Sequence, residues 1–126
     1  MATVAPTWTL IGLPSDTGSA LTSAVYFFKV TWANVNTADT CTAAPCGWLV
    51  DKSVQGTGTC STLSISGSND GVAYAILNDP LDNDLTFTLN GATIIEQMLE
   101  NTYYIKPTMG TATSMTITVF GRVPQQ

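Results

Sequence analysis

The sequence contains no histidine and has few charged residues of either sign. Four Lys and Arg and nine Asp and Glu make up 10% of the chain, whereas soluble domains usually carry about 25%. Without histidine, the usual base for a Ser or Cys nucleophile is missing, and no Ser-x-x-Lys motif supplies a lysine instead. Two facing carboxylates would still suit a glycosidase, but most Asp residues stand in turn contexts. We therefore predict that the protein is not an enzyme.

The charge that is present does not suit nucleic acid or a membrane surface. The net charge is −5, and the four basic residues, Lys29, Lys52, Lys106 and Arg122, are scattered along the chain. Phosphate binding requires clustered bases, and an anionic bilayer repels an acidic protein. The most apolar run, residues 24–30, is too short to span a bilayer. We predict no nucleic-acid partner and no membrane partner.

The start of the chain bears on where the protein is made. No basic residue precedes Lys29, so the positively charged region that opens a secretion signal is missing. We therefore expect the chain to be made and left in the cytoplasm, or to be exported by assembly or lysis rather than by the general pathway.

Cysteine is scarce, and its count is odd. Cys41, Cys46 and Cys60 do not make a complete disulfide framework. Cys41 and Cys46 flank a short segment containing Pro45, so one disulfide across a small loop and three structural thiols are both open. A zinc site would lack a fourth ligand because the chain has no histidine. We predict no metal and no other cofactor.

Threonine, in contrast, makes up one residue in six, and apolar residues alternate with Thr and Ser along much of the chain. Alternation with a period of two is typical of half-buried strands, and the turn Ser68-Asn69-Asp70-Gly71 tolerates a tight hairpin connection. Gly56-Thr57-Gly58 is expected to break the chain, and Pro107 to end a strand. We predict an all-β fold, an antiparallel β-sandwich or jelly roll. Its strands are expected at residues 8–11, 24–32, 47–52, 60–66, 72–77, 85–89, 102–106 and 114–120.

The N-terminal residues are interrupted by proline and glycine. This pattern predicts an irregular arm over residues 1–23 and a single β-sandwich domain over residues 24–126. Residues 33–46 are small and polar, and they are expected to form a long loop. We expect the arm and this loop to contact partners. The candidate contact residues are Trp8, Leu10, Ile11, Leu13, Val35 and Trp48.

One segment carries two conflicting patterns. Thr93 and Glu96 fit a capping box, and the apolar residues of the segment 92–100 have helical spacing. The same residues would also fit an irregular strand across the end of a sheet. We favour one short helix near residues 93–100.

Three acidic residues gather in a predicted loop over residues 78–84. Asp79, Asp82 and Asp84 offer several oxygens, which Ca²⁺ prefers, but their spacing does not match an EF-hand. A solvated acidic loop is the simpler interpretation, and the three residues are kept as candidate metal ligands only.

The second half of the chain carries a resemblance to a known group of proteins. The residues concerned are Ser66-Gly67-Ser68-Asn69-Asp70-Gly71-Val72-Ala73-Tyr74, Tyr104-Ile105-Lys106-Pro107, residues 113–119 and Arg122. In this order they resemble the C-terminal half of small tailed-phage virion proteins, including capsid decoration (cement) proteins. The order also resembles that of galactose-binding-like jelly rolls. Tyr74 stands where Trp is common and Lys106 where Arg is common, and the resemblance covers about residues 60–122.

The resemblance implies a phage virion protein that decorates the outside of the head. Its partners would be the major capsid protein and further copies of itself, as a homotrimer at three-fold positions. It would be made in the host cytoplasm and end on the outer surface of the capsid. The scarcity of charge fits this role, because few charges would lose water on docking.

Two other functions fit the composition. Trp8, Trp32, Trp48, Tyr103 and Tyr104 could form a sugar-stacking platform, as in a carbohydrate-binding module or a receptor-binding tail component, although aromatic residues in strands more often belong to the core. A tail-tube or baseplate component is the other alternative, and it would form rings or stacks.

Overall fold

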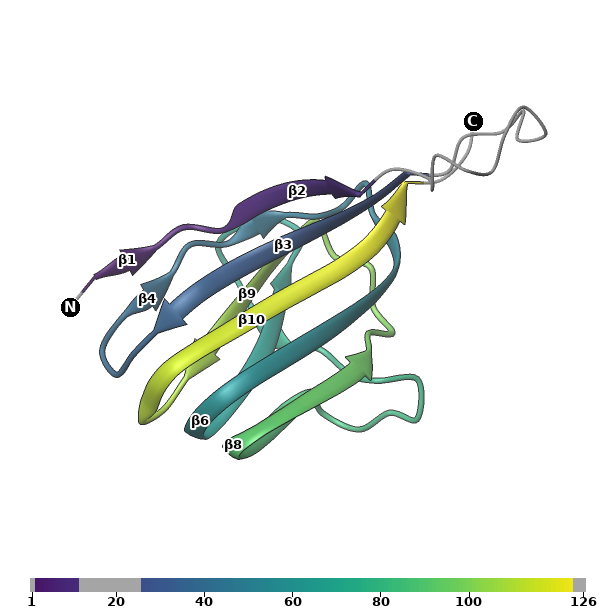
Figure 1. The fold of residues 1–126 in the computed structure, drawn as a ribbon. Helices are drawn as coiled ribbons and strands as arrows, with labels where there is room; N and C mark the ends of the chain where they lie inside the picture. The colour runs from purple at the N-terminus through teal and green to yellow at the C-terminus, as the bar shows by residue number, and fades with distance from the viewer. Residues whose placement is uncertain (1, 12–25, 124–126) are drawn as a thin grey trace, which may run out of the picture.

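A computed structural model of the protein describes residues 2–11 and 26–123, and within these ranges every regular element is a β-strand (Figure 1). The predicted all-β class is therefore confirmed. No described residue is part of a helix that could cross a membrane. The strands are β1 (Thr3–Val4), β2 (Thr7–Ile11), β3 (Tyr26–Val35), β4 (Thr40–Cys41), β5 (Ala44–Pro45), β6 (Val50–Ser68), β7 (Ala75–Ile76), β8 (Thr86–Gln97), β9 (Tyr104–Met109) and β10 (Ala112–Val123).

Most strands belong to one antiparallel sheet that is centred on β6. The sheet runs in the order β2-β3-β10-β6-β9-β5, and β7 and β8 also pair with β6. The short strands β1 and β4 form a separate parallel pair, with Thr3 opposite Thr40. Because β6 is the longest strand, it can serve different partners along its length.

Strand β6 bends so that this single sheet forms two layers. Its residues 50–60 pair with β10, whereas residues 63–68 pair with β9, and the register with β8 shifts at Gly58/Thr59 and again at Cys60/Leu63. Irregularities of this kind bend a strand and increase its twist. The β9–β10 hairpin follows the bend, so β9 lies behind β10 in Figure 1. The result is the curled antiparallel sandwich that the alternating pattern predicts.

The core lies between the two layers and is almost entirely apolar. Alternate residues of β3 and β10 point inward, among them Trp32, Val30 and Ile117, each with no exposed surface. Full burial of such a side chain contributes about 1.5–3 kcal/mol. The Trp32 indole Nε1 donates a hydrogen bond to the Thr42 carbonyl oxygen at 2.8 Å, which satisfies its polar atom inside the core.

The first part of the predicted arm is paired with the rest of the protein. The strand expected at residues 8–11 is confirmed as β2, and β2 pairs along its whole length with β3. Strand β1 pairs with β4. Residues 12–23 lie outside the described residues.

The long loop expected at residues 33–46 is wrong in part. Asn34 and Val35 complete β3, and both β4 and β5 fall inside this segment. The small residues that suggested a loop are instead core residues, because Cys41, Ala44 and Cys46 are buried. Small side chains let these short strands approach the core closely.

The predicted helix near residues 93–100 is wrong, because residues up to Gln97 belong to strand β8. Thr93 does not cap a helix, and its hydroxyl shares a hydrogen bond of 3.0 Å with that of Thr57 on β6. Ile94 is half-buried and Ile95 is 63% exposed, which is the alternation of an edge strand. The hydrogen bonds that β8 forms with residues 53–60 of β6 outweigh the helical spacing of its apolar residues, so the segment is a strand.

Other strands are present where the sequence predicts them, but their bounds differ. The expected break at Gly56-Thr57-Gly58 is absent because β6 runs through it. The strand expected around Trp48 begins only at Val50, and that expected at residues 72–77 is reduced to Ala75–Ile76. Pro107 does not end β9. The pairing of β9 with β5 stops at Ile105, so β5 accepts no hydrogen bond at position 107 and the missing N–H of Pro107 breaks none there.

Candidate interaction surfaces

Three aromatic side chains form a cluster where β2, β3 and the turn before β6 meet. The Trp8 and Trp48 rings stack with centroids 5.3 Å apart, and Phe28 meets Trp48 edge-on at 4.8 Å. Trp48 is 41% exposed, and its Nε1 donates to the Pro45 carbonyl oxygen at 3.1 Å. Leu10 and Val123 extend the cluster into a shallow apolar hollow. The cluster therefore holds Trp48 rigidly at the surface.

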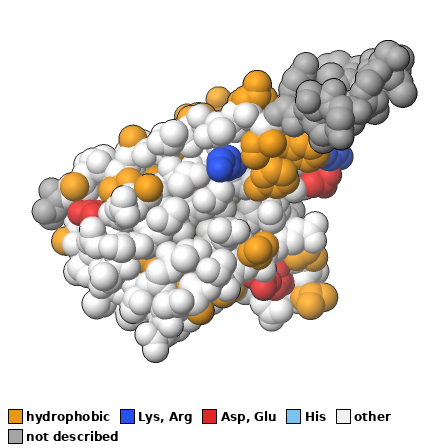
Figure 2. Space-filling view, in the orientation of Figure 1, with side chains coloured by type: hydrophobic (Ala, Val, Ile, Leu, Met, Phe, Trp, Pro, Cys, Tyr) orange, Lys and Arg blue, Asp and Glu red, His pale blue; other side chains and the backbone are white. Residues whose placement is uncertain are grey.

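A second apolar surface covers the outside of the front layer. The rings of Phe27 on β3 and Phe120 on β10 stack with centroids 5.2 Å apart and planes 9° apart. Across β6, Ile95 on β8 stands exposed, and the exposed Lys29 adjoins Phe120. Figure 2 shows apolar side chains gathered on this face beside a basic one. We call this surface the outer apolar face, and its hollow is lined by Lys29, Ser53, Gln55, Ile95, Thr118 and Phe120.

The predicted contact residues fall into different places. Trp8, Leu10 and Trp48 come together in the aromatic cluster, and Ile11 is half-buried at the end of β2. Val35 is only 1% exposed and belongs to the core, because it follows Trp32 on the inner face after an irregular step at Asn34. Leu13 lies outside the described residues.

The sequence interpretation missed the outer apolar face. Phe120 shares a strand face with Thr116 and Thr118, opposite the core residues Ile117 and Val119. A large aromatic residue on the otherwise polar side of a strand is the signal that identifies it, since a core residue would stand on the other side.

The three acidic candidates for a metal site act as turn residues. Asp79 Oδ1 accepts hydrogen bonds from the Leu81 and Asn83 backbone N–H groups at 2.9 and 3.0 Å, and the bond from Asn83 is the largest of the causes that lower the Asp79 pKa. Asp84 Oδ1 accepts from the Asn78 side chain at 3.1 Å, and Asp82 has a φ of 67°. Among the described residues, no three His, Cys, Asp or Glu side chains gather as metal ligands would.

The Ser68–Gly71 turn provides a prediction for acid stability. The Asp70 carboxylate accepts from the Val72 and Ala73 backbone N–H groups at 2.8 and 3.0 Å and from the Ser68 hydroxyl, and these bonds lower its pKa from 3.8. A lowered folded-state pKa stabilises the fold above the unfolded value, and this contribution is lost as pH falls through the folded value. The wild type is expected to lose thermal stability below about pH 4 more steeply than Asp70→Asn, in a series of melting curves against pH. Parallel curves for the two proteins would contradict this role.

The cysteines are buried thiols, and no disulfide joins Cys41, Cys46 and Cys60. Burial raises the pKa of both Cys41 and Cys46 to about 11, and at Cys41 the nearby Asp39 carboxylate adds to this effect. A thiol that stays protonated is a poor nucleophile and a poor metal ligand. The cysteines therefore act as small core residues.

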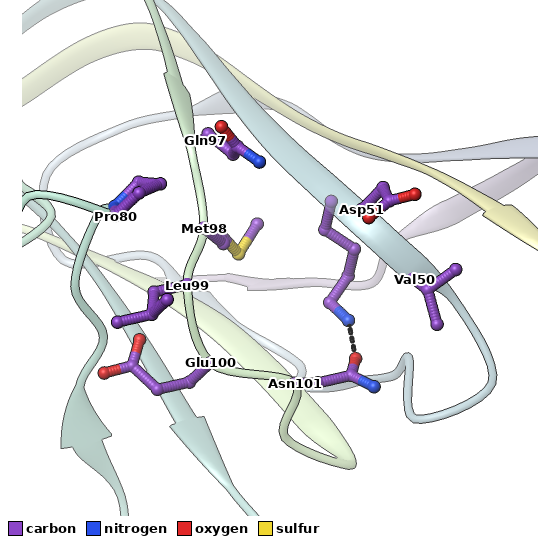
Figure 3. A pocket seen from close by; sticks show the side chains of 9 residues that line it. Val50, Asp51, Pro80, Gln97, Met98, Leu99, Glu100 and Asn101 are labelled. Carbon is purple, nitrogen blue, oxygen red and sulfur yellow. Dashed lines mark hydrogen bonds between the residues drawn. The ribbon is translucent and has the colours of Figure 1, made fainter.

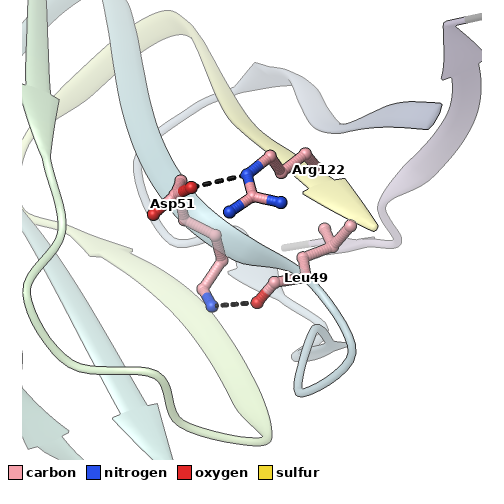
Figure 4. Close-up of polar contacts among 4 residues, drawn as sticks. Leu49, Asp51 and Arg122 are labelled. Atoms are coloured by element: carbon pink, nitrogen blue, oxygen red, sulfur yellow. Dashed lines mark hydrogen bonds and ion pairs between the residues drawn. The ribbon is translucent and has the colours of Figure 1, made fainter. Parts of the chain in front are cut away.

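A cavity of about 330 Å³ opens at the end of the sandwich where β6 begins and β8 ends. Lys52, which is only 2% exposed, reaches into its wall and donates to the Leu49 carbonyl oxygen at 2.8 Å and to Asn101 Oδ1 (Figures 3 and 4). Asp51 turns away from this lysine and pairs with Arg122 Nε at 2.6 Å (Figure 4). That ion pair is exposed and contributes at most about 1 kcal/mol.

Comparison with known proteins gives a likeness in fold. No family model matches the chain, and no curated protein matches it. The SPBc2 prophage-derived protein YomS superimposes with a TM-score of 0.55 at 8% identity, covering 75% of this chain and 92% of YomS. SO0799 from Shewanella oneidensis has a TM-score of 0.35 at 11% identity, and the match covers 91% of this chain and 67% of SO0799. A protein of Bacillus endospore appendages has a TM-score of 0.34 at 9% identity, and the match covers 94% of this chain and 91% of that protein. YomS therefore shares the fold.

Proposed function

We propose that this chain is a non-enzymatic structural protein of a bacteriophage virion, and that it decorates the outside of the head and stabilises the capsid. The observation that carries the proposal is the outer apolar face on a domain with few charges. The fold shared with a prophage-derived protein and the resemblance of residues 60–122 to small virion proteins support the same role.

The outer apolar face has the composition of an interface core. Phe120 is 37% exposed and Ile95 is 63% exposed, and Lys29 is the only charged residue that lines the hollow beside them. Interface cores are depleted of charge and enriched in aromatic residues. Covering this face would remove apolar surface from water at about 25 cal/mol per Å². Within the hollow, Lys29 is the one charge that would lose water. An acidic group on the partner would form an ion pair with Lys29.

The partners in this proposal are the major capsid protein and further copies of the chain in a trimer. Strand β8 pairs with β6 along one side, and among the described strands nothing pairs with its other side. A long edge of this kind tends to be covered in an assembly. The edge and the outer apolar face adjoin at Ile95, so one partner surface can cover both.

The experiment that tests the proposal is co-sedimentation of the purified chain with expanded, undecorated heads of the phage that encodes it. The pellet is then imaged by cryo-electron microscopy, and ordered density at three-fold or quasi-three-fold positions is the expected result. Phe120→Ser should weaken head binding about tenfold or more, as the loss of a central interface aromatic does. Leu81→Ser is the matched control, since Leu81 is 82% exposed but lies in the acidic loop.

Two results would overturn the proposal. A chain that stays in the supernatant as a stable monomer does not decorate heads, and glycan binding with a change in Trp48 fluorescence would then favour the carbohydrate-binding alternative. Equal head binding by Phe120→Ser and Leu81→Ser would show that the outer apolar face is not the docking surface.

A further inference from the structure

Lys52 lies on the face of β6 that is turned towards the core. It lies on the same face of β6 as Val54 and Gly56, which are both buried, and it is itself only 2% exposed. Its aliphatic stem packs over Gly121, where an added Cβ would lie 3.0 Å from Lys52 Cγ. The side chain is therefore fixed in one place, with its nitrogen at the wall of the cavity shown in Figure 3.

The lysine nitrogen meets only neutral acceptors. Its partners are the Leu49 carbonyl oxygen and the Asn101 carboxamide, and within residues 2–11 and 26–123 the single ion pair is the one between Arg122 and Asp51. Burial of a cation is costly and lowers the pKa of Lys52, and it outweighs the opposing effects of Cys46 and of the nearby Asp51 carboxylate. The neutral amine, which is the nucleophilic form, is thus favoured here more than at an exposed lysine.

We propose that Lys52 and Asn101 form an intramolecular isopeptide bond. The amine is already in contact with Asn101 Oδ1, which is bonded directly to the carboxamide carbon Cγ. Lys52 Nζ attacks Cγ, the bond between Cγ and Nδ2 breaks, and the leaving nitrogen departs as ammonia after taking one proton from Nζ. No oxidant or reductant is needed, and water can carry the proton because Asn101 is exposed.

The product fits the site better than the separate side chains do. The charge of Lys52 disappears, and the new amide nitrogen keeps one hydrogen for the Leu49 carbonyl oxygen, 2.8 Å away. The bond would join the start of β6 to the segment after β8, which the Met98 N–H to Lys52 carbonyl bond of 2.9 Å already holds together. A cross-link between distant positions limits the unfolded chain as a disulfide does. This inference does not depend on the proposed function.

The test is the intact mass of the purified full chain under denaturing conditions. The expected mass is lower than the sequence mass by one molecule of ammonia, and peptide mapping is expected to find the Lys52 and Asn101 peptides joined. Asn101→Ala should show its full sequence mass, and it is expected to fold because residue 101 is exposed. Asn101→Asp should lose water instead and reach the same final mass as the linked wild type.

The same variants distinguish the isopeptide bond from a second reaction that also releases ammonia. Asn90-Gly91 can form a cyclic imide with the same change in mass, but Asn101→Ala would retain that loss and the joined peptides would be missing. The proposal is overturned if the folded wild type keeps its full mass, with no joined peptides, after incubation at alkaline pH. Loss of ammonia that persists in Asn101→Ala as the only mass change would overturn it as well.

Discussion

Replacing Trp32 with alanine is expected to lower the free energy of unfolding by about 3–5 kcal/mol, the usual cost of truncating a buried Trp. Trp32 has no exposed surface and is the largest of the fully buried side chains. Its loss opens a cavity between the layers and leaves the Thr42 carbonyl oxygen without the indole donor. Domains of this size are stable by about 5–15 kcal/mol, so the variant should keep only part of its stability.

Urea denaturation followed by circular dichroism measures this effect, and Trp48→Ala is the matched control. Trp48 is 41% exposed and loses its contacts with Trp8 and Phe28, so its truncation should cost about 1–2 kcal/mol. Equal destabilisation by the two substitutions would show that the core is not organised around Trp32.

Gly58→Ala is expected to destabilise the protein by about 3 kcal/mol, because two costs coincide there. Gly58 has a φ of 131°, which side-chain-bearing residues rarely adopt. An added Cβ would lie 2.8 Å from Met115 Sδ and 3.1 Å from Met115 Cα, so β10 would have to move. The residue also stands where the register between β6 and β8 shifts, at the start of the bend that produces two layers.

Gly91→Ala separates the conformational cost from the steric one. Gly91 has a φ of 71°, but nothing lies within 4 Å of an added Cβ, so only the conformational cost of about 1–2 kcal/mol applies. Thermal melting of both variants should place Gly58→Ala clearly below Gly91→Ala. The reverse order would mean that the bend in β6 does not depend on close contact with β10.

The aromatic cluster and the outer apolar face show how differently two surfaces follow from sequence. Trp8 and Leu10 are large apolar residues of the interrupted N-terminal segment, and Trp48 belongs to the strand expected at residues 47–52. The structure brings the three together. Phe27 and Phe120 lie far apart in the chain, and only the pairing of β3 with β10 places their rings against each other. Val35 falls in the loop predicted over residues 33–46, and only its pairing with Met115 of β10 places it in β3.

The sequence by itself determined the all-β class and the inward face of the long strands. Alternation with a period of two is a local property, so Ile117 and Val119 are identified as core residues without any knowledge of their partners. The tertiary structure alone decided that β6 continues through Gly56 and Gly58, that residues 86–97 form an edge strand, and that Lys52 meets Asn101. Each of these depends on which segments pair over long distances, because a strand gains its hydrogen bonds from a neighbour that local sequence does not specify.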